Sequence, residues 1–243
     1  MAIPYERSFF EDREGSIRSA RAVVPIVLEW IRPASMIDVG CGVGSWLKVF
    51  SEHGVEGITG VDGDYVDRDL LLIPKERFVS ADLTRPLAVD GSFDFAMSLE
   101  VAEHLPEASA AAFIASLTKL APVVFFGAAI PFQGGVHHIN EQWPDYWMKL
   151  FAARGYRPAD CIRPRIWANK DVSYFYAQNA ILYVHEGAFD RYPQLAEACR
   201  NTNIDQLSLV HPQQYLPLAE AMNRISRAVP QSVRTAARKL LGL

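Results

Sequence analysis

A short apolar strand runs directly into a glycine-rich turn in the stretch Ser35-Met-Ile-Asp-Val-Gly-Cys-Gly-Val-Gly44, and a helical pattern over 45–51 follows at once. Glycine at positions 40, 42 and 44 removes side chains where a ligand has to approach the backbone and where a tight turn needs positive φ. N–H groups at the start of the following helix can receive a carboxylate. The stretch therefore predicts a ligand-binding strand–turn–helix unit.

Strands and helices alternate along the rest of the chain. The apolar spacing predicts helices at 15–31, 65–72, 107–120 and 143–153, and strands at 56–61, 77–80, 93–98, 122–129, 157–162 and 177–184. This alternation predicts an α/β fold with a Rossmann-like, doubly wound, seven-stranded sheet that is mostly parallel. No obvious helix separates the last two strands, so we expect an antiparallel strand at that edge.

The chain becomes helical and polar after Glu186. We therefore expect a main domain over 1–185 and a helical C-terminal extension over 186–243. The segment 230–241 places basic residues and apolar residues on different faces of a helix. This pattern is typical either of a weak membrane-surface or partner contact or of a terminal helix packed on its own domain.

Composition narrows the classes of protein. The 243 residues carry a net charge of −4, which gives no general attraction to nucleic acid. Three scattered cysteines are too few for a disulfide framework or a zinc site. The N-terminal stretch has early acidic residues and no apolar segment of the signal-peptide kind, so we expect a cytoplasmic protein.

Two carboxylates decide between the cofactors that suit such a turn. A dinucleotide site needs a small glycine-like residue where Ser45 stands, and Asp38 would repel a pyrophosphate. The same Asp38 suits a cationic sulfonium ligand with an α-amino group. Asp62 ends the second strand, from which a carboxylate accepts the two ribose hydroxyls of an adenosine. The residues favour a sulfonium donor over NAD.

These motifs resemble those of the class I S-adenosylmethionine-dependent methyltransferases, in their small-molecule branch. The first motif is Ile37-Asp-Val-Gly-Cys-Gly-Val-Gly-Ser-Trp46, and Phe93-Asp-Phe-Ala-Met-Ser-Leu-Glu-Val-Ala-Glu-His-Leu-Pro106 resembles the fourth-strand motif. Asp62 resembles the ribose-binding acid and Ala81-Asp82-Leu83 the adenine-edge motif. The resemblance implies that S-adenosyl-L-methionine is bound by Asp38, Gly40, Cys41, Gly42, Gly44, Asp62, Asp82, Leu83 and Leu99.

Candidate catalytic groups lie in two clusters after strands. The first contains Glu100, Glu103 and His104, and the second is the loop Gly134-Gly-Val-His-His-Ile-Asn-Glu-Gln-Trp143. Histidines titrate near neutral pH, so His137 or His138 is expected to act as a general base, with Glu103 or Glu141 orienting it. The alternative is that both are ordinary loop histidines. Adjacent histidines cannot easily face one ion, so we expect no metal.

The acceptor follows from the same resemblance. The run Trp143-Pro-Asp-Tyr-Trp147 resembles a segment of bacterial methyltransferases that are encoded near sugar and cell-surface polysaccharide genes. We therefore expect O-methylation of a small hydroxylated metabolite or saccharide and no nucleic-acid partner. Methylation of nitrogen or carbon, or a non-catalytic protein that binds S-adenosylmethionine, would use the same cofactor motifs.

Overall fold

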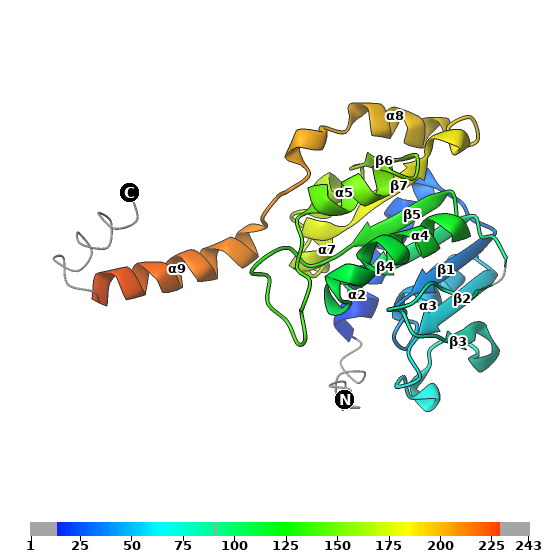
Figure 1. Cartoon of the computed structure of the whole chain (residues 1–243), viewed down its shortest axis with the longest axis horizontal. Helices are drawn as coiled ribbons and strands as arrows, with labels where there is room; N and C mark the ends of the chain where they lie inside the picture. Colours follow the sequence, from blue (N-terminus) through cyan, green and yellow to red (C-terminus); the bar gives the residue numbers. More distant parts are fainter. Residues whose placement is uncertain (1–13, 90, 229–243) are drawn as a thin grey trace. The chain divides into compact units, whose positions relative to one another are not determined.

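The computed structural model describes residues 14–89 and 91–228 of the chain. These residues form one seven-stranded sheet in the order β3-β2-β1-β4-β5-β7-β6 (Figure 1). The strands are β1 (Ser35–Val39), β2 (Gly57–Asp62), β3 (Phe78–Ser80), β4 (Phe95–Leu99), β5 (Val123–Gly127), β6 (Tyr156–Ala159) and β7 (Ile181–His185). Pairing is parallel from β3 to β5, while β7 runs antiparallel to both β5 and β6. The predicted fold class, mostly parallel with antiparallel pairing toward one edge, is confirmed.

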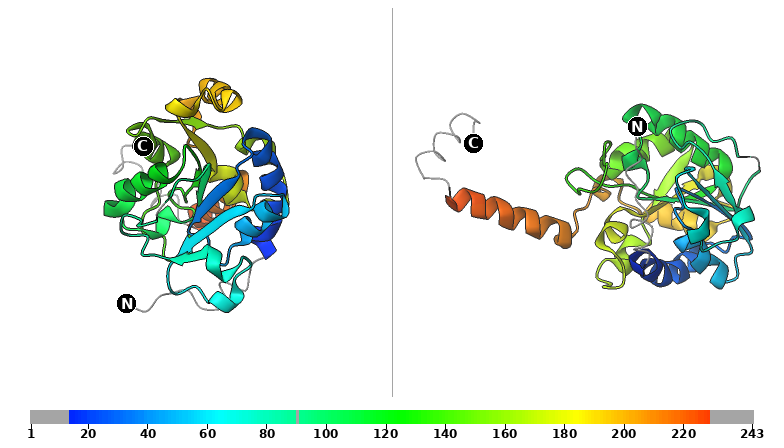
Figure 2. Two further views of the ribbon diagram at one scale, coloured as in Figure 1. Left: turned by 90° about the vertical axis from the view of Figure 1, so that its right-hand side faces the viewer. Right: turned by 90° about the horizontal axis from the view of Figure 1, so that it is seen from below.

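Helices cover both faces of this sheet. All α-helices of the described residues, whether or not they pack on the sheet, are α2 (Glu14–Trp30), α3 (Ser45–Glu52), α4 (Ala110–Leu120), α5 (Pro144–Ala152), α6 (Arg163–Ile166), α7 (Tyr174–Asn179), α8 (Pro193–Asn201) and α9 (Pro212–Ala228). Figure 2 shows α2 and α3 on one side of the sheet and α4 and α5 on the other. Each covered face needs its own apolar set of strand side chains.

The strands supply these two sets by alternation. Met36 of β1 packs into the core under α2 and α3, whereas the next residue, Ile37, packs under α4 and α5. Phe125 and Phe126 of β5 divide in the same way. Because successive side chains of a strand point to opposite faces, a continuous apolar run fills both cores.

Two expected elements are wrong in detail. The helix expected over 65–72 is only a single 3₁₀ turn, Arg68–Leu70. The Asp67 carboxylate accepts a hydrogen bond from the Asp69 N–H at 2.9 Å, and such local side-chain bonds compete with a regular helix. The Leu72 N–H donates to the Val43 carbonyl at 2.8 Å, which ties the segment to the glycine turn instead.

The strand expected over 177–184 begins as a helix. Residues up to Asn179 belong to α7, so α6 and α7 separate β6 from β7. Local preference for a strand is overridden here because Tyr176 and Ala177 pack into the core. The amides of Gln178 and Asn179 are also held by partners from other segments.

The described part of the chain divides into two compact units between Leu209 and Val210. The domain boundary expected after residue 185 stays a prediction. Helix α8 packs against β6 and β7 in the first unit. Buried Arg163 anchors this part: it pairs with Asp160 at 2.6 and 2.8 Å and donates to the carbonyls of Gln178 at 2.9 Å and Leu207 at 2.8 Å.

The second unit contains α9, which exposes the apolar side chains of Tyr215, Leu216, Leu218, Met222 and Ile225. The basic segment expected over 230–241 lies outside the described residues. Within the described part, none of the helices combines the length and apolarity that crossing a membrane requires.

Replacing Arg163 with Ala should destabilise the first unit by about 3–5 kcal/mol, because it leaves Asp160 and two carbonyls without their cation. Urea unfolding measures this loss. Arg165→Ala is the matched control, since Arg165 pairs with Glu29 at an exposed position and such pairs contribute little. Equal effects of the two substitutions would contradict the anchoring role of Arg163.

Candidate active site

The order of the strands predicts a crevice at the carboxyl ends of the central strands, between β1 and β4. From β1 the chain builds outward through β2 and β3 on one side, and through β4 and β5 on the other. Ligands of open α/β sheets bind beyond the carboxyl ends of the strands at such a reversal. A cavity of about 620 Å³ lies there. Its lining residues are Gly40, Gly42, Asp62, Gly63, Asp64, Tyr65, Ser80, Ala81, Asp82, Leu83, Thr84, Glu100, Val101, His104 and Leu105.

The glycine turn forms the floor of this pocket. Gly40 and Gly42 have φ of 87° and 53°, in the left-handed region that favours glycine. A Cβ at Gly40 would lie 2.2 Å from Cγ2 of Val101, so that glycine lets β1 and β4 approach. A Cβ at Gly42 would meet nothing within 4 Å. Gly42 therefore presents bare backbone to the pocket.

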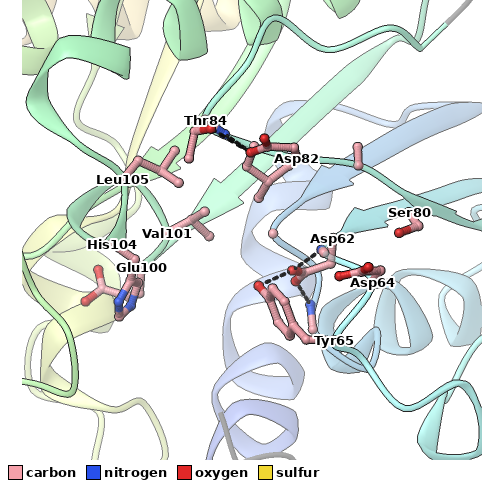
Figure 3. Close-up of a pocket in the computed structure, with 15 residues that line it drawn as sticks. Asp62, Asp64, Tyr65, Ser80, Asp82, Thr84, Glu100, Val101, His104 and Leu105 are labelled. Carbon is pink, nitrogen blue, oxygen red and sulfur yellow. Dashed lines mark hydrogen bonds between the residues drawn. The ribbon is translucent and has the colours of Figure 1, made fainter. Parts of the chain in front are cut away.

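Asp62 organises the side of the pocket above β2. Its carboxylate accepts hydrogen bonds from the N–H groups of Gly42 and Gly63, both at 2.7 Å, and from the Tyr65 hydroxyl (Figure 3). Burial nevertheless raises the pKa of Asp62. The three donors orient a carboxylate that borders the cavity, as a ribose-binding acid requires.

Asp38 is a second buried carboxyl, with 3% of its surface exposed. Burial, with a contribution from the nearby Asp62 charge, raises its pKa well above the ordinary value. A cationic ligand would favour the ionised form of such a group.

Asp82 and Leu83 border the far end of the pocket. One oxygen of the exposed Asp82 accepts from the N–H of Thr84 at 2.9 Å and from its hydroxyl at 2.6 Å. These bonds lower the pKa of Asp82 and fix the turn after β3. Asp82 thus holds a turn at the cavity.

The opposite side of the pocket follows β4, and Figure 3 shows Glu100 and His104 across from Asp62 and Tyr65. Glu100 has φ of 56°, which is uncommon for a residue with a side chain. Its two oxygens accept from the amides of Gln133 at 2.7 Å and Asn179 at 2.9 Å. This network holds a residue in a strained conformation at the pocket wall, a pattern that clusters at functional sites.

Behind this wall, Glu103 and His104 meet His138 from the loop after β5. One potential ligand atom from each lies within 4.8 Å of the other two. Burial, together with the Glu100 charge, raises the pKa of Glu103 well above its usual range. Burial and the neighbouring His138 lower the pKa of His104 to about 4, so His104 is neutral at pH 7.

His138 is oriented by Glu141, as the sequence suggested. The distance from His138 Nδ1 to Glu141 Oε1 is 3.0 Å. The rings of His104 and His138 pack edge to face with centroids 4.8 Å apart. His137, by contrast, is exposed and has φ of 58°. The structure therefore brings His138 and Glu103 together and leaves His137 on the loop surface.

Four expected cofactor residues do not line the cavity. Gly44 lies in left-handed conformation at the start of α3, where a Cβ would meet Ile73 at 3.0 Å. The thiol of Cys41 lies against Gly60, where a Cβ would stand 2.7 Å from it. Asp38, one residue before the end of β1, and Leu99, the last residue of β4, are both buried. Cys41 and Gly44 thus shape the turn, and their contact with a cofactor stays a prediction.

Sequence reasoning missed Tyr65 and the amides that hold Glu100. Tyr65 stands only three residues after Asp62, so an aromatic hydroxyl close to the ribose acid was the available signal. Gln133 and Asn179 carry no such signal, because their contact with Glu100 joins segments far apart in the chain.

A family model described as a methyltransferase domain matches residues 10–158. The chain belongs to this methyltransferase family. The resemblance to class I S-adenosylmethionine-dependent methyltransferases, based on the motifs after β1 and β4, is confirmed.

Solved structures agree with the fold of this methyltransferase. DesVI of Streptomyces venezuelae matches with a TM-score of 0.56 at 13% identity, covering 75% of this chain and 100% of its own. The methyltransferase domain of bacterial CtHen1-C gives 0.52 at 20%, covering 69% and 97%. Magnesium protoporphyrin IX methyltransferase from Synechocystis PCC 6803, solved with bound SAH, gives 0.51 at 17%, covering 76% and 90%. No curated protein matches the sequence.

Alanine at two glycines of the methyltransferase should separate folding from ligand binding. Gly40→Ala should lower the free energy of unfolding by about 1–3 kcal/mol or more, because the Cβ collides with Val101 in addition to the unfavourable φ. Gly42→Ala keeps only the cost of φ, about 1–2 kcal/mol, and fills open space at the pocket.

Urea unfolding and calorimetric titration with S-adenosylhomocysteine measure the two effects. For Gly42→Ala, the loss in free energy of S-adenosylhomocysteine binding should exceed the loss in free energy of unfolding. If Gly42→Ala binds S-adenosylhomocysteine as tightly as the unaltered chain, the glycine floor does not contact the ligand.

Proposed function

We propose that this methyltransferase uses S-adenosyl-L-methionine to methylate a hydroxyl oxygen of a small acceptor, with saccharides as the expected class. One observation carries the proposal. Bare backbone and the oriented Asp62 carboxylate border one side of the pocket, while the Glu103, His104 and His138 group stands behind the other. This arrangement suits donor binding opposite a proton-handling site.

The residues present fit the donor. Asp62 is placed for the ribose hydroxyls, and Asp82 with Leu83 for the adenine edge. Gly42 leaves its backbone open to the pocket, and within residues 14–89 and 91–228 no cation is among the groups that shift the pKa of the buried Asp38. A cavity of about 620 Å³ is of the size that holds a cofactor of this class. The Synechocystis enzyme of the same fold was solved with SAH bound, which supports this choice.

The donor supplies an activated methyl group, so the protein has to align it with the acceptor and to remove the acceptor's proton. Alignment can contribute about 7–11 kcal/mol to lowering the barrier. A hydroxyl must lose its proton as the oxygen–carbon bond forms and the sulfur–carbon bond breaks. The neutral His104 imidazole and the Glu141-oriented His138 are the groups beside the pocket that can accept it.

The loop after β5 supplies apolar surface on the acceptor side. Phe132, Val136 and Ile139 are exposed by 80%, 55% and 62%, and Trp143 by 37%. Aromatic side chains pack well on the apolar faces of sugars. Trp147 of the same sequence run is instead buried against Phe126, so it belongs to the core. Trp143 is therefore the most exposed aromatic residue of that run.

The histidine pair on the loop gives the sharpest test of acceptor chemistry. His138→Ala should reduce turnover by about 10²–10⁴-fold while donor affinity is kept, because the acceptor proton loses its site. His137→Ala is the matched control and should retain turnover, since His137 is exposed. A panel of hydroxylated acceptors, assayed for S-adenosylhomocysteine production, provides the rate. Equal rates in both variants would remove the role of His138, and product only from amine acceptors would overturn the oxygen assignment.

Asp38→Asn should change stability and donor affinity in opposite directions. The folded pKa of Asp38 lies above its unfolded value, so the penalty for ionising it in the folded chain appears as pH rises above about 4. The variant should therefore be the more stable at pH 7, and the difference should vanish below about pH 4.

Thermal unfolding across pH measures this difference. Because the donor's cation loses its buried partner, the affinity for S-adenosylmethionine should fall by at least about tenfold at pH 7. A variant that is no more stable at pH 7, or that binds the donor as well as the unaltered chain, would count against the role of Asp38.

A further inference from the structure

The group of Glu103, His104 and His138 has a composition that general base catalysis does not need. One ligand atom of each side chain lies within 4.8 Å of the other two, and two of these side chains are imidazoles. Bonds from a metal to histidine nitrogen and carboxylate oxygen are about 2.0–2.2 Å long, so two ligand atoms stand up to ~4.4 Å apart. A small inward movement brings all three onto one ion.

Glu103 is the member of the group that most needs a cation. It is 0% exposed, and neither carboxylate oxygen has a hydrogen-bond partner among the described residues. Buried charges in proteins are usually paired or coordinate metals. No lysine or arginine lines the adjoining pocket, whereas Glu100 does. The surroundings of Glu103 are thus negative and contain no fixed cation from the pocket side.

His138 has the second contact that metal-binding histidines usually make. Its Nδ1 lies 3.0 Å from Glu141 Oε1, and a carboxylate at one ring nitrogen fixes the ring and its tautomer. Glu141 is itself fixed, because its oxygens accept from the N–H groups of Phe132 at 2.8 Å and Gly134 at 2.9 Å. The loop therefore presents an oriented imidazole.

The backbone of the same loop is docked on Glu103. The N–H groups of Ile139 and Asn140 donate to the Glu103 carbonyl at 2.9 and 3.0 Å. A Cβ at Gly135 would lie 2.2 Å from His138 Nε2, so glycine is required there for the ring to seat. The approach of His138 to Glu103 is thus built into the loop, and the adjacent His137 need not take part.

We propose that Glu103, His104 and His138 bind a divalent transition-metal ion, such as Zn²⁺, beside the donor pocket. Two imidazoles and one carboxylate favour such an ion over Mg²⁺ or Ca²⁺, which prefer oxygen ligands. Three protein ligands leave a coordination position open. His104 both belongs to the group and lines the pocket, so an ion held by the group would stand beside that pocket (Figure 3).

The role of the ion rests on the function proposed above. Such an ion would lower the pKa of an acceptor hydroxyl beside it, so that the proton could pass to water as the oxygen–carbon bond forms and the sulfur–carbon bond breaks. Glu103, His104 and His138 would hold the ion. The loss of turnover expected for His138→Ala would then follow from loss of the ion, whereas in a chain without the ion His138 itself accepts the proton.

Cobalt titration of the full-length chain, without an affinity tag and after chelator treatment, tests the site directly. Co²⁺ bound to this mixed ligand set gives visible absorption bands, and we expect one equivalent per chain. His138→Ala and Glu103→Gln should weaken binding at least about 10–100-fold, and Glu141→Gln should weaken it to a smaller degree. His137→Ala is the matched control and should bind Co²⁺ normally.

Binding of S-adenosylhomocysteine shows whether each variant is folded, since Asp62 and Gly42 stand apart from the group. Normal Co²⁺ binding by a folded His138→Ala chain, or no Co²⁺ binding by the unaltered chain, would overturn the metal site. A failure of the proposed function can be distinguished from a failure of the metal site. If Co²⁺ binds and no hydroxylated acceptor is methylated, the acceptor class is wrong; if methylation is unchanged by chelator and Co²⁺ does not bind, only the metal site is wrong.

Discussion

The parallel pairing of β1 with both β2 and β4 is the constraint on which the rest of the structure depends. The chain leaves β1 for α3 on one face of the sheet and leaves β4 for α4 on the other, so the loops that follow these two parallel strands diverge and do not cover one another. Backbone at the end of β1 is therefore accessible to a ligand. The glycine turn uses this opening on one side, and the residues after β4 form the other wall.

Carboxyl groups are concentrated around the opening. Asp38, Asp62 and Glu103 are all buried, and Glu100 lines the pocket beside them. Burial raises the pKa of each of the four, since desolvation disfavours the charged form. Such a site is costly without positive charge and is relieved by a cationic ligand. In the proposals made above, a sulfonium donor would meet this need near Asp38 and a metal ion would meet it at Glu103.

How much of the structure can be predicted from the sequence depends on how far apart in the chain the contacting residues are. The turn after β1 and the acid at Asp62 were predictable because their signals are local: glycine spacing and a carboxylate at a strand end. Which of the two loop histidines meets Glu103 was not predictable, because the choice of His138 depends on backbone hydrogen bonds from Ile139 and Asn140 to a residue of another loop. Helix α7 was missed for the same reason, since tertiary packing overrides the strand preference of its aromatic residues.

The two sides of the pocket are built in different ways, and this difference bears on specificity. The donor side consists of tight turns at the ends of β1 to β3, where Gly40 lies against Val101 and an added side chain has no room. The other side, where we propose that the acceptor binds, carries the loop after β5. Apolar side chains of this loop are exposed, while the Glu141 carboxylate and the Glu103 carbonyl accept hydrogen bonds from its backbone. Exposed positions on such a loop can change without altering the bonds that place His138. Acceptor preference can therefore vary while the donor site and the histidine–carboxylate group keep their geometry.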